Sequence, residues 1–131
     1  MPIGQQEFER ALILGAFREL DVDLEVASAQ YEEAMTSYRY MSGSGFSVDF
    51  KLDCEVPTFS EALCATDVFG SACVGEPLND KIGYRISIGG SGKILGIEGF
   101  TFGEVHWPKD RISLPDRIDA AFEKHERLGG F

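Results

Sequence analysis

Apolar residues recur at helical spacing in the first part of the chain. Over residues 5–20 they include Phe8, Leu12 and Phe17, and residues that favour helices fill the positions between them. This spacing predicts a helix over residues 5–20, with one face directed to a core. The segment AQYEEAM then predicts a second helix, over about residues 27–38.

The pattern changes to alternation after a turn rich in Gly and Ser at residues 42–45. Over residues 46–52 each apolar residue is followed by a polar one, which predicts a half-buried strand. Its apolar members are Phe46, Val48, Phe50 and Leu52. Thr58 and Glu61 have the spacing of a capping box, so the segment TFSEALCATDVF predicts a short helix or helical turn that ends near Gly70.

The second half of the chain is typical of an antiparallel meander followed by a helix. Strand-like segments occur at residues 71–77, 82–88, 93–99 and 101–107, and GGSG at 89–92 joins the second to the third as a hairpin. Ser113 begins a predicted closing helix, whose stripe consists of Ile118, Ala121, Phe122 and His125. The pattern therefore predicts one globular α+β domain, residues 1–131, with N-terminal helices and a C-terminal helix packed on a central, largely antiparallel sheet.

Composition narrows the classes of function. Of the 131 residues 44% are hydrophobic, which is enough for a core, and the formal net charge is -10. Because phosphate backbones and anionic membranes are negatively charged, like the protein, we expect neither nucleic acid nor a membrane as a partner. The sequence MPIGQQEFER lacks the order of a signal peptide, and no run of about 18 apolar residues occurs, so we expect a cytoplasmic protein.

The negative charge is concentrated in the first half of the chain. Residues 1–65 contain twelve acidic and four basic side chains, whereas residues 66–131 contain ten and eight. No Lys or Arg lies between Arg18 and Arg39. The carboxylates in that interval form either a solvated helix face or a docking surface for a basic partner. The candidate contact residues are Asp21, Asp23, Glu25, Glu32 and Glu33, with Tyr31 as an aromatic anchor among them.

Two motifs that suggest catalysis lack residues which the chemistry requires. The segment GGSGK at 89–93 has Ser87 and Ile94 where a phosphate-binding loop has Gly and Ser or Thr, and it leads into a strand instead of a helix. A thiol nucleophile needs a neighbouring base. For Cys64 and Cys73 the available bases are His106 and His125, which we interpret as packing or surface residues.

Metal-binding patterns are incomplete as well. DVDLE at 21–25 lacks the central Gly and the final Glu of a calcium loop, and two isolated histidines do not make a transition-metal site. A pair of catalytic carboxylates stays open, because such pairs meet in space and not in sequence. We therefore assign no catalytic residue, cofactor or metal, and we expect no enzyme activity.

A resemblance to a known family adds to this reading. The segments YRYMSGSGFSVDFKL, CVGEP and YRISIGGSGKILGI, followed by a final helix after SLPDRID, resemble bacterial polymorphic-toxin immunity proteins of the SUKH superfamily. The resemblance covers roughly residues 35–122. The link from Leu52 to Cys73 is shorter than in that family, and TFGEVHW adds strand-like sequence before the last helix.

The resemblance implies a cytoplasmic protein that binds and neutralises a cognate toxin delivered between bacteria. A basic toxin would be attracted by the -10 charge. The alternative is a small-ligand-binding domain or enzyme with an aromatic pocket lined by Phe46, Phe50, Phe100 and Trp107. A structural subunit with a solvated acidic helix is a third possibility.

Overall fold

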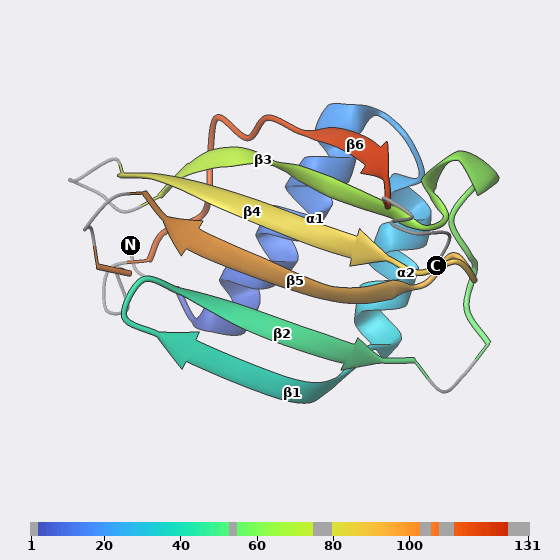
Figure 1. Ribbon diagram of the computed structural model, residues 1–131, viewed down its shortest axis with the longest axis horizontal. Coiled ribbons are helices and arrows are strands. Elements are labelled where there is room, and N and C mark those ends of the chain that lie inside the picture. The colour runs from blue at the N-terminus through green and yellow to red at the C-terminus, as the bar shows by residue number, and fades with distance from the viewer. Residues whose placement is uncertain (1–2, 53–54, 75–79, 103–105, 108–111, 126–131) are drawn as a thin grey trace.

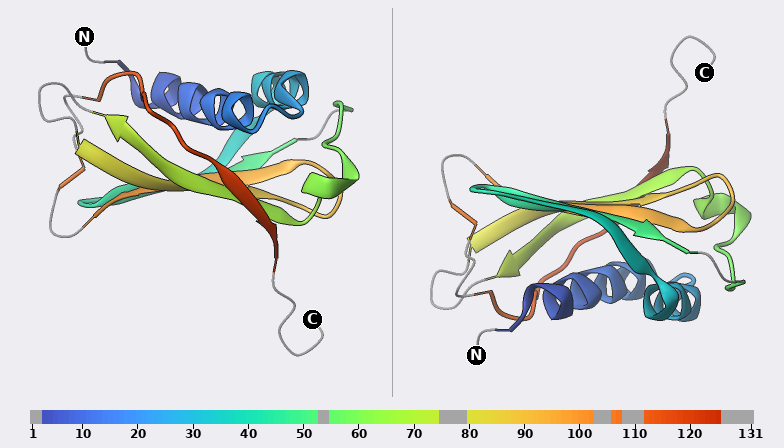
Figure 2. Two further views of the ribbon diagram at one scale, coloured as in Figure 1. Left: turned by 90° about the horizontal axis from the view of Figure 1, so that it is seen from above. Right: turned by 90° about the horizontal axis from the view of Figure 1, so that it is seen from below.

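A six-stranded antiparallel sheet forms the centre of the molecule, and two helices cover one of its faces (Figure 1, Figure 2). The computed structural model describes residues 3–52, 55–74, 80–102, 106–107 and 112–125. The strands are β1 (Met35–Ser42), β2 (Gly45–Lys51), β3 (Thr66–Val74), β4 (Asp80–Ile88), β5 (Ile94–Thr101) and β6 (Ala121–Lys124). Their order in the sheet is β1-β2-β5-β4-β3-β6, and the predicted α+β class is confirmed.

The two helices lie at the start of the chain, as the sequence pattern predicted. Helix α1 (Gln5–Leu20) has the predicted bounds. Helix α2 (Leu24–Glu33) begins and ends earlier than predicted, since Ala34 has an extended backbone and β1 starts at the next residue. The prediction of helix beyond Glu33 was therefore wrong. The β-forming residues of TSYRY pair with β2 instead, and this tertiary pairing outweighs the local helical pattern.

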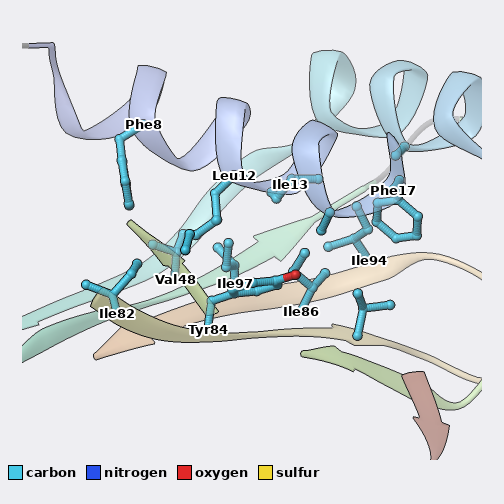
Figure 3. Packing of buried hydrophobic residues seen from close by; sticks show 14 of the residues in the cluster. Phe8, Leu12, Ile13, Phe17, Val48, Ile82, Tyr84, Ile86, Ile94 and Ile97 are labelled. Carbon is cyan, nitrogen blue, oxygen red and sulfur yellow. The ribbon is translucent and has the colours of Figure 1, made fainter. Parts of the chain in front are cut away.

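The hydrophobic core lies between α1 and the covered face of the sheet. Figure 3 shows Phe8, Leu12 and Phe17 of α1 above side chains of the central strands, among them Val48, Tyr84, Ile86 and Ile97. The predicted alternation on β2 is confirmed, because Phe46 and Val48 are buried while Asp49 is exposed.

The predicted helix near residues 58–70 is wrong. A single turn of 3-10 helix, η1 (Glu61–Leu63), is all that forms there, and β3 begins at Thr66. Val68, Ala72 and Val74 are buried at even-numbered spacings of four and two residues, so they share one face of a strand, a pattern that the capping-box spacing obscured.

The predicted C-terminal helix is also wrong. Residues 121–124 form the edge strand β6, which pairs with residues 66–69 of β3. The segment before it runs beside the rest of β3: the Ser71 amide donates to Asp119 Oδ1 at 2.7 Å, and the Asp119 amide donates to the Ser71 carbonyl at 2.9 Å. These contacts satisfy backbone groups that a helix would have left unpaired on β3. Residues 126–131 lie outside the described residues.

Of the meander strands, the last differs from the prediction. Strands β4 and β5 and the hairpin turn between them lie where expected. The predicted strand at residues 101–107 does not form in its described part, since Thr101 is the final residue of β5 and Phe102 is a bend. Residues 103–105 of that prediction lie outside the described residues.

Candidate functional site

The clearest candidate site is a groove along the solvent-facing side of α2. It is an open hollow of about 630 Å³, lined by Glu25, Ser28, Ala29, Glu32, Glu33, Glu55, Val56 and Pro57. We call it the acidic groove. Four of its eight lining residues are glutamates, and the helical positions 25, 28, 29, 32 and 33 share one face of α2 because they are spaced by three or four residues. The small Ser28 and Ala29 leave the centre of the groove hollow between the carboxylates.

The hydrogen bonds of a buried glutamine hold the elements that form the acidic groove together. Gln30, on the opposite face of α2, is fully buried. Its Nε2 donates to the carbonyl oxygens of Pro57 at 2.8 Å and Gly92 at 2.9 Å, and its Oε1 accepts from the Ile94 amide at 2.9 Å. The amide therefore holds α2 against the β4–β5 hairpin and holds the segment that carries Glu55 against α2. These three hydrogen bonds fix the position of α2 and of the segment around Pro57.

The turn between the helices extends this acidic surface. Asp21 and Asp23 both have left-handed backbones, with φ of 55° and 50°, which Asp tolerates better than most residues. Together with Glu25 they line a second hollow of about 430 Å³, in which Arg18 is the basic side chain. Asp23 Oδ2 accepts from the Ser60 amide at 2.8 Å, so part of its charge is already used inside the protein.

The structure thus brings five of the six predicted contact residues to one side of the molecule. Glu25 lines both hollows, and it joins Asp21 and Asp23 to Glu32 and Glu33. Glu55 was missed by the sequence reasoning because it lies outside the acidic run, and hydrogen bonds such as Gln30–Pro57 hold its segment against α2.

Tyr31 does not line the acidic groove. Its ring packs edge-on against Phe50 with a centroid distance of 5.9 Å, and its hydroxyl donates to the Gln6 carbonyl at 3.2 Å. Burial raises the pKa of Tyr31, and the nearby Glu9 carboxylate adds to this. Tyr31 therefore joins α2 to α1 and β2, which is a packing role, and it is not an exposed anchor between the carboxylates.

A buried ion pair lies next to this contact. The side chain of Glu9 on α1 is 1% exposed, and the Arg39 guanidinium of β1 donates to its two oxygens at 2.5 and 2.9 Å. Gln5 Nε2 also donates to Glu9, at 2.8 Å. The hydrogen bonding that Arg39 donates to Glu9 raises the pKa of Arg39 against the opposing effect of burial. This bidentate pair fastens β1 to α1.

The aromatic residues proposed for a ligand pocket are not together. Phe46 and Trp107 pack against each other in the core with ring centroids 5.1 Å apart. Phe50 contacts Tyr31, and Phe100 is 39% exposed on the uncovered face of the sheet. That face has its own hollow of about 500 Å³, lined by Phe69, Phe100 and Phe102, and Gly83 lies against the rings of Phe100 and Phe102. The uncovered face was not anticipated as a surface with aromatic side chains.

Among the described residues, no side-chain hydrogen bond joins a candidate cysteine to a candidate histidine. Cys64 Sγ lies 3.7 Å from the Phe59 carbonyl oxygen, and Cys73 belongs to β3. His125 Nε2 lies 3.0 Å from Asp67 Oδ1, and His106 is exposed. Among the described residues no group of three or more His, Cys, Asp or Glu side chains is arranged to hold a metal ion. Within the same residues no helix is long and apolar enough to cross a membrane.

Comparison with protein-family models, with curated proteins and with solved structures finds no match for this chain. The structure itself defines an α+β protein with an acidic groove formed by α2 and the neighbouring segment 55–57.

Proposed function

We propose that this protein is a cytoplasmic immunity protein that neutralises a cognate, basic, secreted bacterial toxin by direct protein–protein inhibition. The observation that carries the proposal is the acidic groove, in which Glu25, Glu32, Glu33 and Glu55 surround a hollow about 630 Å³ in volume. A groove of this kind fits Lys or Arg side chains presented by a partner. Carboxylates accept charge-assisted hydrogen bonds from guanidinium groups in a geometry that neutral acceptors do not reproduce.

Electrostatics supports a basic protein as the partner. The chain has a formal net charge of -10, and like charges gathered along α2 repel one another in the free protein. A basic partner relieves this repulsion as it docks, and the attraction speeds its association. The same field discourages acidic competitors, including nucleic acids.

We infer the contact residues from the linings of the two hollows. Glu25, Glu32, Glu33 and Glu55 form the centre, and Asp21 and Asp23 flank it at the turn between the helices. Tyr31 affects partner binding indirectly, because its ring packs against Phe50 and so fixes the position of α2. The resemblance of residues 35–122 to immunity proteins of the SUKH superfamily supports a toxin as the basic partner. We infer that toxin and inhibitor are encoded side by side.

Survival of toxin-producing cells tests this function. Bacteria that express the toxin domain encoded by the adjacent gene should survive when they also express the wild-type protein. A variant with Glu25, Glu32, Glu33 and Glu55 all changed to Gln should lose protection, because the docking charge is removed. Circular dichroism of the purified variant should show the wild-type fold, since these side chains line a surface hollow.

A control of equal charge separates a local effect from a general one. Changing Glu7, Glu61, Asp116 and Glu123 to their amides removes the same charge from exposed positions outside the acidic groove. This control should protect as well as the wild type. Survival with the groove variant, or failure of the wild-type protein to protect against the adjacent gene product, would overturn the proposal.

A further inference from the structure

Strand β1 forms one edge of the sheet, and its outer side is open among the described residues (Figure 1). It is eight residues long and exposes large apolar side chains: Met35 at 64%, Tyr38 at 58%, Tyr40 at 56% and Met41 at 37%. Soluble proteins commonly protect edge strands with charge, Pro or short length, because free backbone groups invite another strand. The opposite edge, β6, has only four residues, and they include Glu123 and Lys124.

Charge distinguishes β1 from the rest of the chain. Between Glu33 and Asp49 the sequence contains no Asp or Glu, although the chain as a whole has 22 acidic residues. The one charged side chain in this interval is Arg39, and its guanidinium is already bound to the buried Glu9. The edge is therefore close to neutral. Two copies of this acidic protein can approach each other along β1 with less repulsion than along α2.

We propose that a second copy of this chain pairs with β1 in antiparallel fashion, so that the two sheets continue into each other across a twofold axis. A twofold interface brings the same surface from both copies together. In an antiparallel pair of identical edge strands, the free N–H groups of each strand face the free C=O groups of the other. A basic partner has no reason to prefer this edge, because β1 offers it no carboxylate.

The hairpin geometry places the axis at Tyr40. A register shift between Thr36 and Tyr38 interrupts the start of β1, which leaves Tyr38–Ser42 as the regular part. Gly43 and Ser44 form a two-residue turn closed by the pair Ser42–Gly45. In such hairpins the closing pair is hydrogen-bonded and the pattern alternates from there, so the backbone groups of Arg39 and Met41 are directed to the free edge.

Pairing of Arg39 with Met41 of the other copy then sets Tyr40 opposite its own equivalent. The two Tyr40 residues form a non-hydrogen-bonded pair, in which Cα atoms lie about 4.5 Å apart. Their rings share the uncovered face of the sheet, because Tyr40 pairs with Ser47 and the core-facing Val48 pairs with Arg39. Contact between these rings covers apolar surface that is exposed in one copy.

Sedimentation equilibrium of the purified chain, without toxin and under reducing conditions, tests the pairing. We expect a mass of twice 14.4 kDa at high concentration, which falls toward 14.4 kDa on dilution. Tyr40→Glu sets two carboxylates against each other at the axis and should give a monomer. Leu95→Glu is the matched control, because Leu95 is 49% exposed and lies on β5 away from the edge. This control should dimerise as the wild type does.

A cross-link tests the register independently of folding effects. Tyr40→Cys should form a covalent dimer under mild oxidation, since paired residues at non-hydrogen-bonded positions come within disulfide reach. Leu95→Cys and the wild type, treated in the same way, should not. A wild-type mass of 14.4 kDa at all concentrations would overturn the proposal, as would a dimer that Tyr40→Glu leaves intact. If the chain is monomeric and Tyr40→Glu abolishes toxin binding, the edge belongs to the toxin and the second copy is excluded.

Discussion

Helix α2 and strand β1 are consecutive in the chain, with only Ala34 between them, yet they present opposite surfaces. The solvent side of α2 gathers Glu25, Glu32 and Glu33 around a hollow, whereas β1 contains no acidic residue and exposes Tyr and Met side chains. The difference shows that the charge of this protein is segregated and not simply spread for solubility. In our account α2 attracts a basic toxin and β1 accepts a second copy.

Both surfaces depend on buried polar contacts that hold them in place. The three hydrogen bonds of Gln30 fix α2, and the Glu9–Arg39 ion pair fixes β1 to α1. Each contact joins elements that are distant in sequence. Removing one of them should therefore disturb one surface more than the other.

The largest effect is expected at the ion pair. Arg39→Met leaves the buried Glu9 carboxylate without its cation, which should lower the free energy of unfolding by roughly 3–5 kcal/mol. Urea denaturation measures this change. The double variant Glu9→Gln with Arg39→Met should regain much of the loss, because no uncompensated charge remains. A loss below about 1 kcal/mol for Arg39→Met would be typical of an exposed pair and would contradict the buried one.

Gln30→Ala should have the next largest effect. It leaves the Pro57 and Gly92 carbonyls and the Ile94 amide without their side-chain partner, at a cost of about 2–3 kcal/mol in unfolding free energy. Because the groove carboxylates are unchanged in sequence, weakened toxin binding by this variant would show that their placement matters. The control Gln6→Ala alters an exposed glutamine on α1 and should be nearly neutral. Equal stability of the two variants would refute the role of Gln30.

The sequence correctly predicted the elements whose hydrophobic pattern lies within one short segment. Helix α1 and strand β2 show their periodicity within one segment, and the acidic run between Arg18 and Arg39 is visible in the sequence without further information. The failures involve pairing between distant segments. Strand β6 exists because β3 offers it backbone partners, and Glu55 joins the acidic groove because Gln30 binds the Pro57 carbonyl. Such contacts leave no periodic trace in the sequence.

A smaller effect on stability is expected at Tyr31 of α2, whose ring contacts Phe50 of β2. Burial raises the pKa of Tyr31 above its ordinary 10.0. Since the folded state favours the neutral phenol, this contribution is complete below pH 10 and is lost as the pH rises above it. The free energy of unfolding, measured between neutral and strongly alkaline pH, should therefore fall less steeply with pH for Tyr31→Phe than for the wild type. Tyr38→Phe, at an exposed position, should follow the wild type. A Tyr31→Phe curve parallel to the wild type would contradict the assignment.

The smallest change in stability is expected at the exposed pair between Arg10 and Glu32. Their charged atoms lie 4.0 Å apart and both side chains are largely exposed, so Arg10→Ala should alter the free energy of unfolding by about 0–1 kcal/mol. The same substitution removes a cation beside the acidic groove. It should therefore speed toxin association slightly at low salt, which stopped-flow fluorescence can measure. Slower association would show that Arg10 itself contacts the partner.

The rate of toxin association, measured by surface plasmon resonance at low and high salt, tests whether the toxin docks on the acidic groove. Changing Glu25, Glu32, Glu33 and Glu55 to Gln should slow association about tenfold or more at low salt, with a smaller difference at high salt. Tyr40→Glu, which changes only the β1 edge, should leave the association rate near the wild-type value. Unchanged rates for the groove variant, together with slow association of Tyr40→Glu, would place the toxin on β1 and contradict the account.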